Sequence, residues 1–194
     1  MDRDILIDLR TWKEKTQRLP LILLGARQIG KTFILQDFGK RYFKQYHYLN
    51  FEHKKSLRKI FSGDLNPQSL INQIEAILQV TIHTKTDLLI LDEIQFCPEA
   101  ITSLKYFAET MPELAITAAG SLLGIELDHS FPVGKVDMLH MFPMSFYEFL
   151  QGIGEEKILS YIQSFKADHA IPDAVHEQLW HKLKIYLVVG GMPA

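Results

Sequence analysis

The sequence predicts a three-layer α/β/α fold, in which a parallel β-sheet lies between two layers of helices. Short apolar runs alternate along the chain with longer segments of helical periodicity, as expected of strands separated by helices. The runs at residues 21–24 and 88–91 are apolar without interruption, which is typical of strands buried on both faces of a parallel sheet. We expect this sheet to form the core of the protein.

The first half of the chain is predicted to begin with a short amphipathic helix over residues 5–15, because its apolar side chains recur at helical spacing. Residues 20–25 form the first strand, and a helix follows over 32–41. A second strand is expected over 46–51. Residues 54–80 read as two helical pieces, because a glycine and a proline interrupt the pattern between them.

The second half of the sheet is predicted from three further runs. Residues 87–94 form the third strand, and a helix begins at Pro98, a residue that suits the first turn of a helix. That helix is expected to end near residue 111, before Pro112. The remaining strands are expected over 114–119 and 136–141.

The chain becomes helical after about residue 145. Ser145 followed by Glu148 is the pattern of a capping box, which starts a helix. Two more helical stretches are expected, over 155–166 and 173–188. We therefore expect a core domain over residues 1–144 and a small helical lid over residues 145–194.

The composition is that of an ordinary globular protein. The chain has 194 residues, of which 47% are hydrophobic and 23% charged, and its net charge is -2. This length fits one domain and part of a second, and the charge balance argues against a surface that binds polyanions throughout. A single cysteine excludes a disulfide framework. The N-terminus lacks the apolar segment of a signal peptide and no run approaches about 18 apolar residues, so we expect a cytoplasmic protein without a membrane span.

The most specific pattern is the loop after the first strand, which fits G-x-x-x-x-G-K-[ST] at every fixed position. Its glycines let backbone N–H groups converge on an anion. Lys31 would place a positive charge between the β- and γ-phosphates of a nucleotide, and the Thr32 hydroxyl would ligate Mg²⁺. This segment, called here the phosphate loop, comprises Gly25, Ala26, Arg27, Gln28, Ile29, Gly30, Lys31 and Thr32.

Polar residues at the ends of the third and fourth strands complete the predicted site. Asp92 is expected to hold Mg²⁺, and Glu93 to polarise an attacking water, a pair that favours hydrolysis over transfer to a small acceptor. Ser121, after the fourth strand, would reach the γ-phosphate or that water; the alternative is a serine that begins a turn. Ligands bind at this edge of open α/β sheets.

The arginines are unevenly placed, because all six lie within the first 58 residues. Phosphoryl chemistry of this kind usually needs a cation beside the γ-phosphate. The candidate is Lys135, whose alternative interpretation is an ordinary surface lysine, and lysine lacks the planar fork of arginine. We therefore expect slow hydrolysis by this chain alone, with a cation supplied by a partner or by sequence beyond residue 194.

Four segments together carry a resemblance to a known family, namely GARQIGKT, LLILDEIQ, AAGSLLG and FPVGK…FPMSFYEFL. In this order they resemble bacterial and archaeal AAA-type P-loop ATPases over roughly residues 20–194. The resemblance implies ATP as ligand and a sheet of order 5-1-4-3-2 with a helical lid. It assigns phosphate binding to Lys31, metal binding to Thr32 and Asp92, water activation to Glu93 and γ-phosphate sensing to Ser121.

The resemblance also implies a C-terminal effector domain with a nuclease-like fold beyond residue 194. The apolar ending over residues 188–194 fits a chain that was cut from a longer one. Members often carry Gly-Arg where this chain has Gly134-Lys135, which puts an arginine finger at this position in doubt.

Three functions remain open from the sequence. The first is an ATPase module that hydrolyses Mg·ATP to move a lid, an effector domain, a partner protein or a neighbour in a homo-oligomer. The second is a fragment of a nucleic-acid-dependent motor, since residues 92–95 match D-E-x-Q and basic residues cluster at 54–59. Against it, a helicase needs a second motor domain with its own arginines, which we do not find in these 194 residues. The third is an adaptor that binds ATP without hydrolysing it, which the missing arginines favour.

Overall fold

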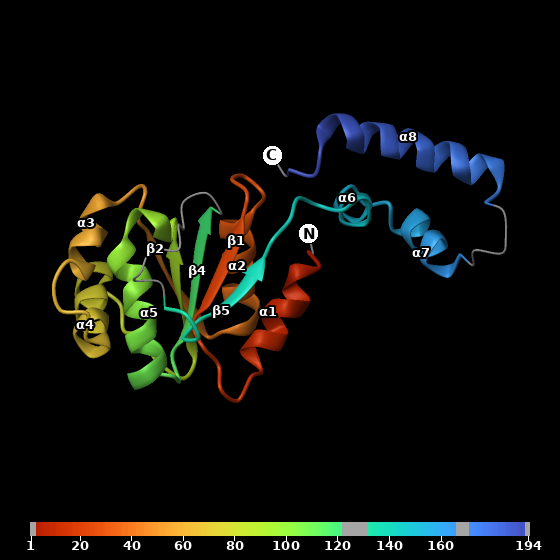
Figure 1. Ribbon diagram of the computed structural model, residues 1–194. Coiled ribbons are helices and arrows are strands. Elements are labelled where there is room, and N and C mark those ends of the chain that lie inside the picture. The colour runs from red at the N-terminus through yellow and green to blue at the C-terminus, as the bar shows by residue number, and fades with distance from the viewer. Residues whose placement is uncertain (1–2, 122–131, 166–170, 193–194) are drawn as a thin grey trace.

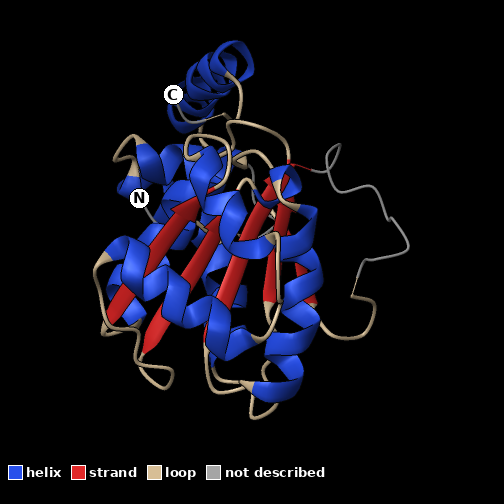
Figure 2. Cartoon of the chain, turned by 90° about the vertical axis from the view of Figure 1, so that its left-hand side faces the viewer, coloured by secondary structure: helices blue, strands red, loops and turns tan. Residues whose placement is uncertain are grey.

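A five-stranded parallel sheet lies at the centre of the computed structural model, which describes residues 3–121, 132–165 and 171–192 (Figure 1). The strand order is β2-β3-β4-β1-β5, which is the predicted order 5-1-4-3-2 seen from the other edge. Figure 2 shows the strands side by side behind a layer of helices. The strands are β1 (Leu21–Gly25), β2 (Gln45–Asn50), β3 (Asp87–Asp92), β4 (Ala115–Ser121) and β5 (Asp137–His140).

Helices cover both faces of the sheet, as the uninterrupted apolar strands predict. Successive strand residues point to opposite faces, so Leu21 and Leu23 pack with one group of helices while Ile22 and Leu24 pack with the other. On the first face lie α1 (Ile5–Lys13) and α2 (Lys31–Tyr42). On the second face lie α3 (Lys55–Arg58), η1 (Lys59–Phe61), α4 (Pro67–Leu78), η2 (Ile94–Phe96) and α5 (Pro98–Thr110).

The third strand ends two residues earlier than its sequence predicts. The backbone of Glu93 is left-handed, with φ of 53°, and this turns the chain out of β3 directly after Asp92. The short 3₁₀ helix η2 follows at once. The fourth strand, in contrast, extends two residues beyond the prediction and includes Ser121.

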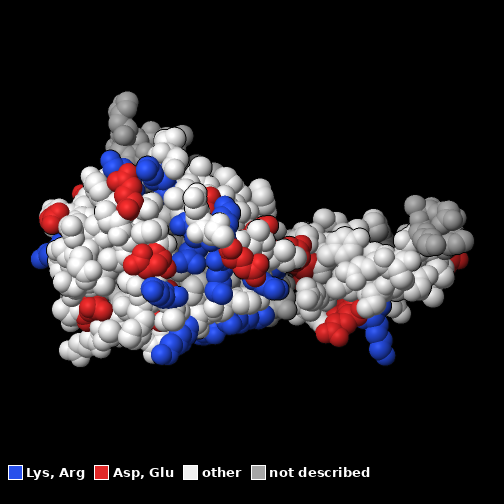
Figure 3. Space-filling view, turned by 90° about the horizontal axis from the view of Figure 1, so that it is seen from below, with Lys and Arg blue, Asp and Glu red and all other residues white. Residues whose placement is uncertain are grey.

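The C-terminal helices are α6 (Phe146–Gly152), α7 (Glu156–Ser164) and α8 (Asp173–Val189), and they project to one side of the sheet (Figure 1). The predicted capping box at Ser145 is present. Among the described residues, α7 and α8 contain no fully buried side chain. Seen from below, the helical projection carries few charges, whereas acidic and basic side chains intermingle over the sheet region (Figure 3). The boundary after residue 144 stays a prediction.

Two hydrogen bonds, one from α8 itself and one to the chain after it, connect this region to the start of α6. The Tyr186 hydroxyl donates to the Met144 carbonyl at 2.7 Å, and the Met144 N–H donates to the Gly191 carbonyl at 2.7 Å. Within the described ranges, no helix is long and apolar enough to cross a membrane.

Gly25, the last residue of β1, lies where two segments approach closely. A Cβ at this position would collide with the backbone carbonyl of Met141 and with the side chain of Ile29. The chain after β5 is fixed there, because the Met141 N–H donates to the Leu24 carbonyl at 2.7 Å. The absence of a side chain therefore lets the chain after β5 lie against the beginning of the phosphate loop.

We predict that Gly25→Ala lowers the free energy of unfolding by about 1–3 kcal/mol, the usual cost of forcing extra atoms into a packed site. Denaturant unfolding of both proteins measures the difference. Gly63→Ala is the matched control, because a Cβ there meets nothing within 4 Å. Equal losses of stability in the two variants would contradict this account of Gly25.

Candidate functional site

The phosphate loop joins β1 to α2, and its conformation depends on left-handed residues. Gly30 has φ of 93° and Gln28 has φ of 64°, and α2 begins immediately afterwards at Lys31. The Lys31 ammonium is buried and donates to the carbonyls of Gly25 at 3.0 Å and Ala26 at 2.6 Å. Burial lowers the pKa of this ammonium. The loop thus wraps around its own lysine.

The Asp92 carboxylate lies at the centre of a hydrogen-bond cluster and is 2% exposed. Its Oδ2 accepts hydrogen bonds from the Thr32 hydroxyl at 2.8 Å, from the Tyr48 hydroxyl at 2.6 Å and from the Asn50 amide at 3.3 Å. Its Oδ1 accepts the N–H of Glu93 at 3.0 Å. Several donors to one carboxylate compensate the cost of burying it.

Sequence reasoning missed Tyr48 and Asn50. They are two residues apart on β2, so they lie on the same face, and Asn50 is paired with Asp92 in the strand register. Burial, together with the hydrogen bond to Asp92, raises the pKa of Tyr48. The signal in the sequence is the pair of polar side chains near the end of the second predicted strand. This pair predicts contacts with Asp92 only if β2 is known to lie beside β3.

Glu93 turns away from the strand and faces the phosphate loop. A left-handed backbone is uncommon for a residue other than glycine, and such strain is often found at functional sites. Its carboxylate accepts a hydrogen bond from the side-chain amide of Gln95. A pocket of about 540 Å³ brings these groups together; it is lined by Gln28, Gly30, Lys31, Thr32, Phe33, Glu93 and Met192.

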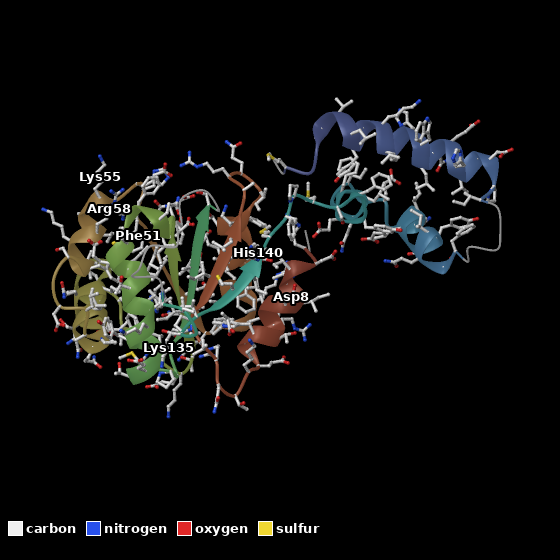
Figure 4. All side chains as sticks on the ribbon, viewed as in Figure 1. Asp8, Phe51, Lys55, Arg58, Lys135 and His140 are labelled. Atoms are coloured by element: carbon white, nitrogen blue, oxygen red, sulfur yellow. The ribbon has the colours of Figure 1, made fainter. Side chains whose placement is uncertain are left out.

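The structure places Ser121 beside the phosphate loop and Lys135 far from it. Ser121 is the last residue of β4, is 9% exposed and is paired with Gly25 in the sheet register. Lys135 lies just before β5, whose first residue pairs with Leu21 at the opposite end of β1. Figure 4 shows Lys135 at that lower edge, and its ammonium lies 3.1 Å from Glu109. This placement corrects the expectation that Lys135 reaches the γ-phosphate.

The basic cluster at residues 54–59 lies near the same edge of the sheet as the site. Figure 4 shows Lys55 and Arg58 at this upper edge. The Arg58 guanidinium already has internal contacts, because it donates to the Phe51 carbonyl at 2.8 Å and lies 5.3 Å from the centre of the Phe96 ring. Arg58 is therefore part of the packing around α3.

The donor set at the site suits a hard cation with oxygen ligands. In the described part of the chain, no three His, Cys, Asp or Glu side chains gather into a metal site. The Thr32 hydroxyl and the Asp92 carboxylate nevertheless converge within 2.8 Å. Magnesium commonly takes only one or two protein ligands and completes its shell with water and phosphate oxygens. These residues fit Mg²⁺ in the presence of a nucleotide.

Comparison with known proteins agrees with the geometry. A family model described as an AAA domain matches residues 17–150. No curated protein shows a significant sequence match to the chain.

Two solved structures share the fold. The Walker-type ATPase PABY2304 of Pyrococcus abyssi is 15% identical with a TM-score of 0.57, and the match covers 99% of this chain and 64% of that one. The Drosophila ORC bound to DNA is 14% identical with a TM-score of 0.51, covering 95% of this chain and 56% of that one. The chain therefore spans about two-thirds or less of these proteins.

We predict that Tyr48→Phe lowers the free energy of unfolding by about 1.5 kcal/mol, because the Asp92 carboxylate loses a close donor. Denaturant unfolding at neutral pH measures the change. Tyr147→Phe, which alters a half-exposed ring on α6, should stay within about 0.5 kcal/mol of the wild type. If both variants were equally stable, the Tyr48 hydroxyl would have no special role in the cluster.

Proposed function

The chain belongs to the AAA domain family, and we propose that it is an ATPase module that binds Mg·ATP and hydrolyses it to ADP and phosphate. One observation carries the proposal. The Thr32 hydroxyl of the phosphate loop donates to the Asp92 carboxylate at 2.8 Å, and Glu93 lines the same pocket as Lys31. These are the groups that nucleotide hydrolysis requires, and they come from two separate segments of the chain.

In the proposed complex, the phosphates of ATP occupy the pocket around Lys31. Its ammonium exchanges the carbonyls of Gly25 and Ala26 for phosphate oxygens. The first turn of α2 contributes N–H groups that have no partner within the helix, and these favour an anion. Thr32 and Asp92 hold Mg²⁺, which when bound supplies positive charge that offsets the charge of the phosphates.

Glu93 is the proposed base for the attacking water. The water oxygen forms a bond to the γ-phosphorus while the bond to the bridging oxygen of ADP breaks, and the carboxylate accepts the water proton. Gln95 holds this carboxylate by a hydrogen bond. Ser121, at the end of the strand next to β1, is the proposed contact for the γ-phosphate or the water.

We propose that this chain supplies only part of the positive charge needed near the γ-phosphate. Among the described residues that line the pocket, Lys31 is the single cation. Arg27 is an exposed residue of the phosphate loop, and Lys135 lies at the opposite edge of the sheet. We therefore propose that a second molecule of this chain, a C-terminal effector domain or a partner protein completes the charge, and that the chain alone hydrolyses ATP slowly.

The proposed output of hydrolysis is movement of the helices after residue 144. They project from the sheet, and Met192, which follows α8, lines the pocket with the phosphate loop. A change in the pocket can thus reach these helices directly. The DNA in the Drosophila ORC structure belongs to that protein.

We predict that Lys31→Ala weakens ATP binding by about a hundredfold, because charge-assisted hydrogen bonds to the phosphates are lost. Titration calorimetry with ATP and Mg²⁺ measures the affinity. Lys105→Ala, which removes an exposed ammonium from α5, should bind within twofold of the wild type. Unchanged affinity in Lys31→Ala would count against a nucleotide at the phosphate loop.

We predict that Glu93→Gln keeps ATP affinity but lowers the rate of hydrolysis by roughly 10²–10⁴-fold, the usual contribution of a general base. Phosphate release in a single turnover measures the rate, and Glu113→Gln on an exposed turn is the control. Tight binding without hydrolysis in the wild type would favour the adaptor. Hydrolysis that requires single-stranded DNA would favour the motor.

A further inference from the structure

Arg3 is a buried arginine whose side chain contacts three separate parts of the molecule, and it is 7% exposed. Its Nε donates to Oε1 of Glu148 in α6 at 2.8 Å. Its Nη1 donates to the Ile29 carbonyl in the phosphate loop at 3.2 Å, and its Nη2 to the Phe142 carbonyl before α6 at 2.8 Å. The planar fork of a guanidinium spreads its donors over three nitrogens, so one side chain reaches three separated acceptors.

The partner carboxylate of Arg3 is itself fully engaged. Oε1 of Glu148 also accepts the Asp4 N–H at 2.9 Å, and Oε2 accepts the Ser145 N–H at 2.8 Å. Burial alone would raise the pKa of Glu148, but the hydrogen bonds from Arg3, Ser145 and Asp4 outweigh it and hold the pKa below its ordinary value. Glu148 therefore carries its charge at neutral pH. Buried ion pairs are expensive to desolvate, which suggests a role beyond stability.

The contact with Ile29 determines how the phosphate loop presents its donors. In a trans peptide the carbonyl and the next N–H point to opposite sides. When Arg3 holds the Ile29 carbonyl on the side of α6, the N–H of Gly30 points the other way, and Gly30 lines the pocket. The loop also holds Gln28, which is not a glycine, in a left-handed conformation, and such strain persists only when the surrounding structure supports it.

We infer that Arg3 is a positioning residue that holds the phosphate loop in its binding conformation and links this conformation to the placement of α6. The inference rests on the proposed binding of ATP. Because the same guanidinium contacts both segments, a ligand that stabilises the loop also stabilises α6, and the linkage is reciprocal.

Arg3→Lys and Arg3→Met test the inference in the full chain. Lysine keeps a cation for Glu148 but cannot reach the other two acceptors, so it separates the ion pair from the loop contact. The control is Lys15→Met, which removes an ion pair. The Lys15 ammonium lies 3.0 Å from the Asp137 carboxylate, near the end of β1 that is opposite the phosphate loop. Both Arg3 variants should bind ATP about tenfold more weakly in calorimetry with Mg²⁺, whereas the control stays within twofold.

Hydrogen exchange of residues 146–152, with and without ATP, is the second readout. ATP should slow this exchange in the wild type and in Lys15→Met but not in Arg3→Lys. A purely structural Arg3 would lower the melting temperature of the free protein and leave both ATP readouts unchanged, which would overturn the inference while the proposed function stands. A wild type that binds no ATP would overturn both. If Arg3→Met fails to fold, Arg3→Lys alone decides the outcome.

Discussion

The hydrogen bond between Thr32 and Asp92 joins the first turn of α2 to the end of β3, which is 60 residues away in the sequence. In the sheet, β4 lies between β3 and β1, the strand that leads into α2. The hydrogen bond depends on the strand order, because the chain passes from β1 to the outer strand β2 and returns through β3 and β4. Such a reversal opens a crevice at the carboxyl ends of the strands. The strand β4, which lies between β1 and β3 in the sheet, ends at Ser121.

Two buried cations donate hydrogen bonds to carbonyls of the phosphate loop. The Lys31 ammonium donates to two of these carbonyls, and the Arg3 guanidinium donates to a third. These hydrogen bonds fix the backbone carbonyls of Gly25, Ala26 and Ile29. The loop is therefore ordered before a ligand binds, and this reduces the loss of conformational entropy on binding.

Local patterns predicted the strands and the loop, because apolar runs and glycine spacing act within a few residues. The sequence also indicated the capping box at Ser145, a contact between neighbours. It could not place Lys135, since the register of β5 against β1 decides at which edge that residue lies. It also missed Tyr48 and Arg3, whose partners lie 44 and 145 residues away, and it carried β3 past Asp92 because the left-handed Glu93 leaves no apolar signal.

The position of Met192 has a practical consequence. This residue lines the nucleotide pocket, yet it comes from the segment that follows α8. The chain has one cysteine, Cys97, which is 1% exposed and whose thiol has a pKa raised by burial to about 11. A thiol introduced at position 192 would therefore be the reactive one. A dye attached there would sit at the mouth of the pocket and serve as an optical sensor of occupancy.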